Sequence, residues 1–139
     1  MPQRSGIFTG NSFRTTYVEV DEPQWGPLEA LSALVRQRCD LRHFHPGEFM
    51  YMATVGVARR QLVIHLYKHV DTRRYLNLDD GMHAYVYIDT PAEVQQANYS
   101  GRYRQLRSLP AALDRLELHL FETARLWRSF PPESWPSAT

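Results

Sequence analysis

The chain has 139 residues, of which 43% are hydrophobic and 22% are charged, and this composition is typical of one globular domain. Its net charge of +1 is too small for the strong positive field of a typical nucleic-acid-binding domain. No apolar run approaches the ~20 residues of a membrane-spanning helix, and a single cysteine excludes an intramolecular disulfide.

The start of the chain lacks the pattern of a secretory signal, so we expect a cytoplasmic protein without membrane association. Fifteen of the sixteen basic residues are arginine. This bias is expected of a GC-rich bacterial genome, but it also suits bidentate or stacking contacts to a ligand. Composition alone leaves both interpretations open.

The first element is predicted from β-branched and aromatic residues over 13–20, which favour a strand. Residues 1–12 contain Gly and Ser and are predicted to be a flexible N-terminus. A helix is predicted within 21–39, with Asp21 and Glu22 near its start and Pro27 able to occupy a first turn. The apolar residues of this segment recur at intervals of three and four, so one face of the helix should be buried: Leu28, Leu31, Leu34, Val35 and Cys39.

Four strands are predicted next, because the hydrophobic period changes to two. Their ranges are 48–58, 61–69, 73–78 and 82–88. The sequence Asp79-Asp80-Gly81 predicts a tight hairpin between the last two, with Gly81 supplying a positive φ. Consecutive strands joined by short turns predict an antiparallel meander.

Helices are predicted after the meander. Thr90-Pro91-Ala92-Glu93 matches a capping box, so a helix should begin at Pro91 and be interrupted near Ser100-Gly101. A last helix is predicted from about Leu109. It has a broad apolar stripe: Leu113, Leu116, Leu118, Leu120, Phe121, Ala124, Leu126 and Trp127.

The predicted fold is therefore a single α+β domain over 13–130. An antiparallel β-meander of four to five strands forms its sheet, and an N-terminal helix and C-terminal helices cover one face. Residues 131–139 are predicted to be a Pro-rich C-terminal tail, whose Trp135 either docks on the domain or contacts a partner.

Side chains alternate across each strand, which divides the predicted sheet into two faces. We expect the aliphatic side chains of the last three strands to share the face under the helices, because a shift of one residue would bury the polar set. The first strand of the meander does not show which of its two sets joins them. The opposite face would gather nine side chains: His65, Tyr67, His69, Arg73, Tyr75, Asn77, His83, Tyr85 and Tyr87.

These nine residues are the predicted ligand-binding site. The leading hypothesis is a non-catalytic binding module for a small anionic or aromatic ligand or for a protein partner, with no cofactor. Alternatives are a solvated face, a sheet-to-sheet homodimer, and a small cofactor-independent enzyme with a His/Tyr-lined pocket on the same face. Binding of single-stranded nucleic acid by stacked aromatics is a further, less favoured alternative.

Catalytic residues and a metal site are not predicted. The chain lacks the G-x-S-x-G, Walker and C-x-x-C motifs. His43-x-His45 with Glu48 has the wrong spacing for the first cupin motif, so cupin metal chemistry is not expected. His65, His69 and His83 would lie on adjacent strands, but each is explained as a polar side chain of an exposed strand.

Overall fold

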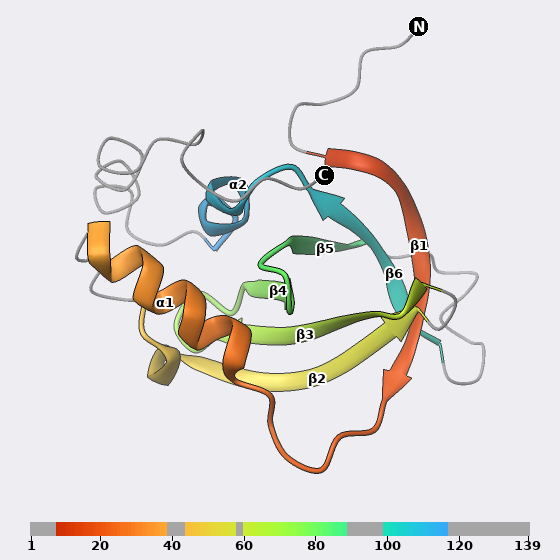
Figure 1. The fold of residues 1–139 in the computed structure, drawn as a ribbon, viewed down its shortest axis with the longest axis horizontal. Coiled ribbons are helices and arrows are strands. Elements are labelled where there is room, and N and C mark those ends of the chain that lie inside the picture. Colours follow the sequence, from red (N-terminus) through yellow and green to blue (C-terminus); the bar gives the residue numbers. More distant parts are fainter. Residues whose placement is uncertain (1–7, 39–43, 58–59, 89–98, 117–139) are drawn as a thin grey trace, which may run out of the picture.

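The computed structural model describes residues 8–38, 44–57, 60–88 and 99–116. Six antiparallel strands form a closed barrel in which each strand pairs with the next and the last pairs with the first (Figure 1). The strands are β1 (Phe8–Val18), β2 (Phe49–Val57), β3 (Leu62–His69), β4 (Tyr75–Asp79), β5 (Ala84–Ile88) and β6 (Tyr99–Leu106).

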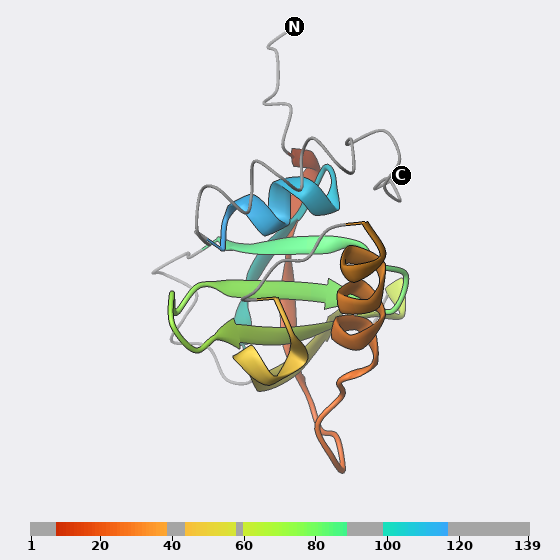
Figure 2. The same ribbon diagram turned by 90° about the vertical axis from the view of Figure 1, so that its left-hand side faces the viewer.

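The described helices are α1 (Gly26–Arg38), the 3-10 helix η1 (Pro46–Glu48) and α2 (Leu109–Asp114). Helix α1 contacts β4, and α2 contacts β5 and β6. Figure 1 and the turned view in Figure 2 place α1 and α2 on the same side of the barrel. The opposite side, which includes much of β1, has no helix over it among the described residues.

The predicted fold class is wrong, because the sheet is a closed six-stranded barrel and not an open α+β meander covered by helices. The four central strands and their consecutive antiparallel pairing are confirmed. The prediction missed β6, where a helix interruption had been placed, and it started β1 at Phe13 although the strand begins at Phe8. Because β1 pairs with both β2 and β6, every described strand has a partner strand on each side.

Buried side chains form two clusters on the two faces of the barrel wall. The inner cluster fills the barrel and draws on β1, β2, β3, β5 and β6: Phe13, Ala53, Val55, Leu62, Ile64, Leu66, Tyr85 and Tyr103. The outer cluster packs the helices against the strands. It includes Leu28, Leu31 and Val35 of α1, Leu109, Ala112 and Leu113 of α2, and Tyr67, Leu76, Leu78, Ala84 and Leu106 of the strands.

The pairing of β3 with β4 differs by one residue from the predicted arrangement. Leu66 lies opposite Asn77, and Tyr67 lies opposite Leu76. Directly paired residues of antiparallel strands project to the same face, so the aliphatic set of β3 faces the barrel interior with the polar set of β4. The expectation that the aliphatic sets share one face is therefore wrong between these strands.

A β-bulge in β2 answers the question that the sequence left open there. Tyr51 pairs with Tyr67 but Ala53 pairs with Leu66, so one extra residue, Met52, lies between them. A bulge of this kind shifts the alternation of side chains. Phe49 and Tyr51 thus belong to the outer cluster, and Val55 belongs to the inner cluster.

The β4–β5 hairpin is confirmed, but its backbone differs from the predicted one. The positive φ is found at Met82 (68°) and not at Gly81. The Asp79 carboxylate holds the turn, since Oδ1 accepts hydrogen bonds from the backbone N–H groups of Gly81 (2.9 Å) and His83 (2.8 Å). These bonds account for a left-handed residue other than glycine in the turn.

The helix predicted within 21–39 is confirmed as α1, with Pro27 in its first turn and Leu28, Leu31 and Val35 fully buried, but it begins at Gly26 and not near Asp21 and Glu22. The predicted helix start near Leu109 is confirmed, and the Ser108 hydroxyl caps it by accepting from the Ala111 N–H. Cys39, the helix predicted at Pro91, the apolar stripe beyond Leu116 and the tail over 131–139 lie outside the described residues. None of the helices in the described ranges has the length and apolar character needed to cross a bilayer.

Candidate functional site

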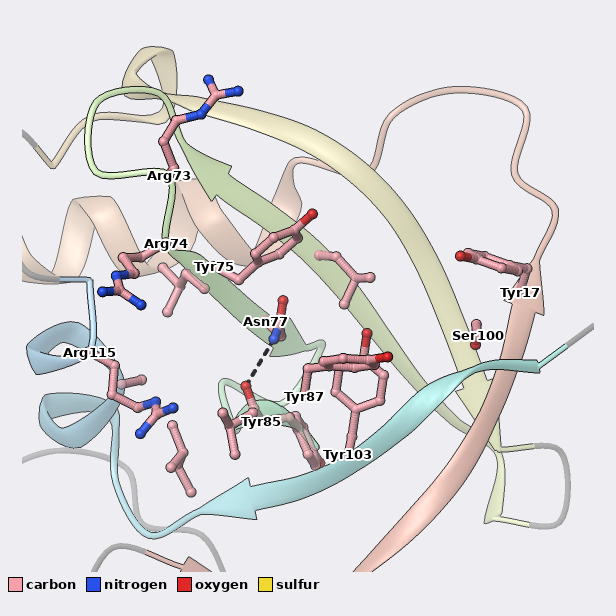
Figure 3. Close-up of a pocket in the computed structure, with 15 residues that line it drawn as sticks. Tyr17, Arg73, Arg74, Tyr75, Asn77, Tyr85, Tyr87, Ser100, Tyr103 and Arg115 are labelled. Carbon is pink, nitrogen blue, oxygen red and sulfur yellow. Dashed lines mark hydrogen bonds between the residues drawn. The ribbon is translucent and has the colours of Figure 1, made fainter. Parts of the chain in front are cut away.

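A cavity of about 450 Å³ opens where β4 and β5 separate (Figure 3). These strands pair only at Asn77–Tyr85 and Leu78–Ala84. The next residues of both strands line the cavity, which extends from the barrel interior to α2. Its lining residues are Tyr17, Leu66, Arg73, Arg74, Tyr75, Leu76, Asn77, Tyr85, Val86, Tyr87, Ser100, Tyr103, Leu106, Ala112 and Arg115.

Tyrosine rings form much of the cavity wall. Tyr75 and Tyr87 are 43% and 44% exposed, whereas Tyr85 and Tyr103 are buried. Tyr87 meets Tyr103 edge-on, with 5.5 Å between ring centroids. Rings of this kind present flat apolar surface together with a polar hydroxyl, which suits contact with an aromatic ligand.

Gly101 allows the Tyr87 ring to lie against β6. A Cβ atom at this position would be 2.4 Å from Cε1 of Tyr87, which is closer than atoms can approach. The residue also has a φ of 138°, which side chains other than hydrogen rarely permit. A glycine is therefore required twice over, by the backbone and by the neighbouring ring.

Tyr85 anchors the inner end of the cavity. Its hydroxyl donates a 2.9 Å hydrogen bond to Asp79 Oδ2. Burial raises the pKa of Tyr85 well above its usual value of 10, and the negative charge and hydrogen bond of Asp79 raise it further. Tyr85 therefore stays protonated at neutral pH and acts as a fixed donor to Asp79, not as an acid or base.

Asn77 holds an unpaired acceptor at the cavity wall. Its Nδ2 donates to the backbone carbonyl of Tyr85 (3.1 Å), which fixes the orientation of the amide (Figure 3). The opposite atom, Oδ1, is buried and accepts no hydrogen bond from the described residues. Leaving such an oxygen unmatched costs about 1–3 kcal/mol, and native structures contain few of them.

The charge at the cavity is of one sign. Arg73, Arg74 and Arg115 line it, and among the described lining residues there is no aspartate, glutamate or histidine. Figure 3 places Arg74 and Arg115 on the α2 side and Tyr17 and Ser100 at the opposite end. The cavity is therefore polarised, with guanidinium groups at one end and hydroxyl groups at the other.

The structure divides the nine predicted site residues into two groups. Arg73, Tyr75, Asn77, Tyr85 and Tyr87 line the cavity. The other four, namely His65, Tyr67, His69 and His83, do not line it. His65, Tyr67 and His69 belong to the outer face. They lie opposite Leu78, Leu76 and Phe49, which are all members of the outer cluster.

Several cavity residues were missed. Arg74 was not among the nine predicted site residues, and Ser100 and Tyr103 lie in a strand that was not predicted. The alternation of Gly101, Tyr103 and Gln105 with Arg102 and Arg104 in β6 was the available signal for that strand. Tyr17 was visible in the first predicted strand, but only the pairing of β1 with β6 brings it near the other residues.

The outer group includes a hydrogen-bond chain that resembles a hydroxyl–imidazole–carboxylate arrangement. His65 Nδ1 lies 3.0 Å from Thr54 Oγ1, and His65 Nε2 lies 3.1 Å from Asp80 Oδ1. Tyr51 also bonds to the Thr54 hydroxyl. Thr54 is 1% exposed and does not line the cavity, so these hydrogen bonds are explained by the need to pair buried polar atoms.

The ring and the hydroxyl of Tyr67 also have partners on the outer face. It stacks on Trp25 with 5.8 Å between ring centroids, and its hydroxyl donates to the Gln24 carbonyl. Burial raises the pKa of Tyr67 well above its usual value of 10. This tyrosine is therefore a packing residue of the outer cluster.

Ligand atoms of Glu48, His69 and Asp71 lie within 4.8 Å of one another, which is close enough to hold a metal ion. However, His69 Nδ1 already accepts from the backbone N–H groups of Asp71 (3.2 Å) and Thr72 (3.3 Å). In the neutral ring the other nitrogen then carries the proton and donates. This arrangement favours a hydrogen-bonded turn over a metal centre.

The chain was compared with protein families, curated proteins and solved structures. No protein-family model matches the chain, and neither the curated proteins nor the solved structures include a significant match. The geometry of the barrel and its cavity therefore carries the functional inference by itself.

Proposed function

We propose that the protein is a non-catalytic binding module that holds a small organic ligand in the cavity between β4 and β5. The observation that carries this proposal is a cavity of about 450 Å³ walled by tyrosine and aliphatic side chains and rimmed by arginine. Its volume falls within the ~300–1,000 Å³ range of small-molecule sites, which are mostly apolar with a few placed polar groups.

The enzyme alternative receives less support. A small acid–base enzyme needs a histidine or carboxylate in contact with the substrate. Within the described part of the chain, the His65–Asp80 and His83–Asp79 pairs lie outside the cavity lining. A binding role requires no such group.

Binding of nucleic acid or a second copy of the chain remains a separate prediction. The half-exposed Tyr75 and Tyr87 lie near arginines, which is a combination that stacks bases and holds phosphates. A cavity recessed between strands suits a small molecule better than a polymer. The cytoplasmic location and bacterial origin likewise stay predictions.

The test is a thermal-shift screen of a broad metabolite library against the wild-type protein and Val86→Phe. Val86 lines the cavity and is half-buried on β5, so a larger aromatic side chain should fill the cavity while suiting a strand. We expect compounds that raise the Tm of the wild type but not of the folded variant. Compounds that raise both equally, or none at all, would exclude the proposed function.

A further inference from the structure

We propose that the ligand is a planar aromatic monoanion that also carries a hydroxyl or N–H donor. The anion would lie at Arg115 on the α2 side of the cavity, the ring among the tyrosines, and the donor at Asn77 Oδ1. This inference rests on the proposed small-molecule function, and it specifies the ligand class for the same cavity.

The preference for an anion follows from the one-sided charge of the lining. Guanidinium groups bind carboxylates through paired N–H donors, and no described lining residue supplies a competing carboxylate. Arg115 follows α2 directly and is exposed. The Lys68 ammonium adds positive charge near the cavity, since it lies 5.7 Å from the centroid of the Tyr75 ring.

The preference for an aromatic ring follows from the shape and chemistry of the wall. Tyr75 and Tyr87 are 43% and 44% exposed, and both line the cavity, so their rings offer flat apolar surface to a ligand. Gly101 and the edge-on contact with Tyr103 hold the Tyr87 ring in place. A planar ligand would cover these two faces and gain stacking contacts.

The requirement for a donor follows from Asn77. Its Oδ1 cannot turn away, because the same amide donates to the Tyr85 carbonyl. The atom has almost no exposed surface and no partner among the described residues, so neither bulk water nor those residues match it. Because Asn77 itself lines the cavity, the partner that we assign to this oxygen is a donor of the ligand bound there.

The experiment compares ligands that differ by one group. The probes are 6-hydroxy-2-naphthoate, 2-naphthoate, 2-naphthol and naphthalene, with 4-hydroxybenzoate and benzoate as a shorter pair. Dissociation constants are measured by calorimetry or by quenching of probe fluorescence. In one of the two series, naphthalene or benzene, we expect the acid that carries a hydroxyl to bind more tightly than every other probe. Removing its hydroxyl should weaken binding by about tenfold, because a buried acceptor is left unmatched.

Variants assign each effect to a residue. Asn77→Leu should abolish the difference between the hydroxylated and unhydroxylated acids. Arg115→Gln should abolish most of the difference between 6-hydroxy-2-naphthoate and 2-naphthol. Arg36→Gln is the matched control, since Arg36 is an exposed arginine on α1 that does not line the cavity, and it should bind all probes as the wild type does. The comparison of ligands on the wild type needs no variant, so it holds even if Asn77→Leu fails to fold.

The outcomes separate the two proposals. If compounds from the broad screen bind with Val86→Phe sensitivity but the naphthalene and benzene probes show no gain from hydroxyl or carboxylate, the ligand class is wrong and the binding function stands. If the probes bind equally to wild type and Val86→Phe, and the broad screen yields no compound whose binding is sensitive to Val86→Phe, both proposals fall. If the hydroxyl and the carboxylate of the probes each strengthen binding, and if Asn77→Leu and Arg115→Gln remove these gains, the two proposals are supported.

Discussion

The outer and inner faces of the barrel use the same residue types to different ends. On the outer face, His65 and Tyr67 have their polar atoms paired with Thr54, Asp80 and the Gln24 carbonyl. On the cavity side, Asn77 leaves an acceptor unmatched, and tyrosine rings remain half-exposed. The comparison teaches that tyrosine and histidine content alone does not distinguish a site from a packed surface, whereas unmet bonding capacity beside a cavity is the basis on which we propose one.

The largest expected effect contrasts one tyrosine from each side. Tyr67→Ala should lower the free energy of unfolding by about 3–5 kcal/mol, because it removes a fully buried ring from the outer cluster. Tyr75→Ala should change it by less than about 1 kcal/mol, since that ring is 43% exposed. Urea unfolding measures the free energy of unfolding of both variants. Similar losses for the two variants would contradict the division of roles.

The second prediction concerns the support of the cavity wall. Gly101→Ala should destabilise the protein by at least about 2 kcal/mol, from the strained backbone and the clash with Tyr87 together. The double variant with Tyr87→Ala should recover the part due to the clash and keep the backbone part. Equal stability of the single and double variants would show that the ring is not in contact.

The third prediction uses two neighbouring aspartates. Asp79→Asn should cost about 1–3 kcal/mol, because its carboxylate accepts from two backbone N–H groups and from the Tyr85 hydroxyl. Asp80→Asn should cost less than about 1 kcal/mol, because Asp80 is 73% exposed in its pair with His65. Thermal and urea unfolding of both variants, compared side by side, provide the measurement. A larger loss for Asp80→Asn would mean that the outer chain stabilises the fold more than the turn does.

The fourth prediction is a dependence of stability on alkaline pH. Tyr67 and Tyr85 have raised pKa values in the folded protein, so the folded state favours their protonated forms. Their contribution is complete below the unfolded pKa of about 10 and decreases as the pH rises above it, by about 1.4 kcal/mol per pH unit for each tyrosine. Urea unfolding between pH 9 and 11 should show this decline. Tyr67→Phe and Tyr85→Phe should each remove part of this decline.

Part of the candidate site was predictable from local pattern. Tyr75, Asn77, Tyr85 and Tyr87 were correctly grouped, because β4 and β5 form a tight hairpin whose register depends on a short turn. His65, Tyr67 and His69 were grouped with them wrongly. The β3–β4 connection sets a register that differs by one residue from the expected one, and such a shift moves every side chain of a strand to the other face.

The sequence by itself determined the four central strands, the position of α1 with its buried stripe, and the hairpin at Asp79, because each depends on residues close together in the chain. Only the tertiary structure decided barrel closure, the two buried faces and the cavity. Closure depends on β1 pairing with β6 across about ninety residues, and alternation within a strand contains no information about which distant strand it meets. Once a barrel wall has apolar side chains on both faces, polarity no longer separates the interior from the surface.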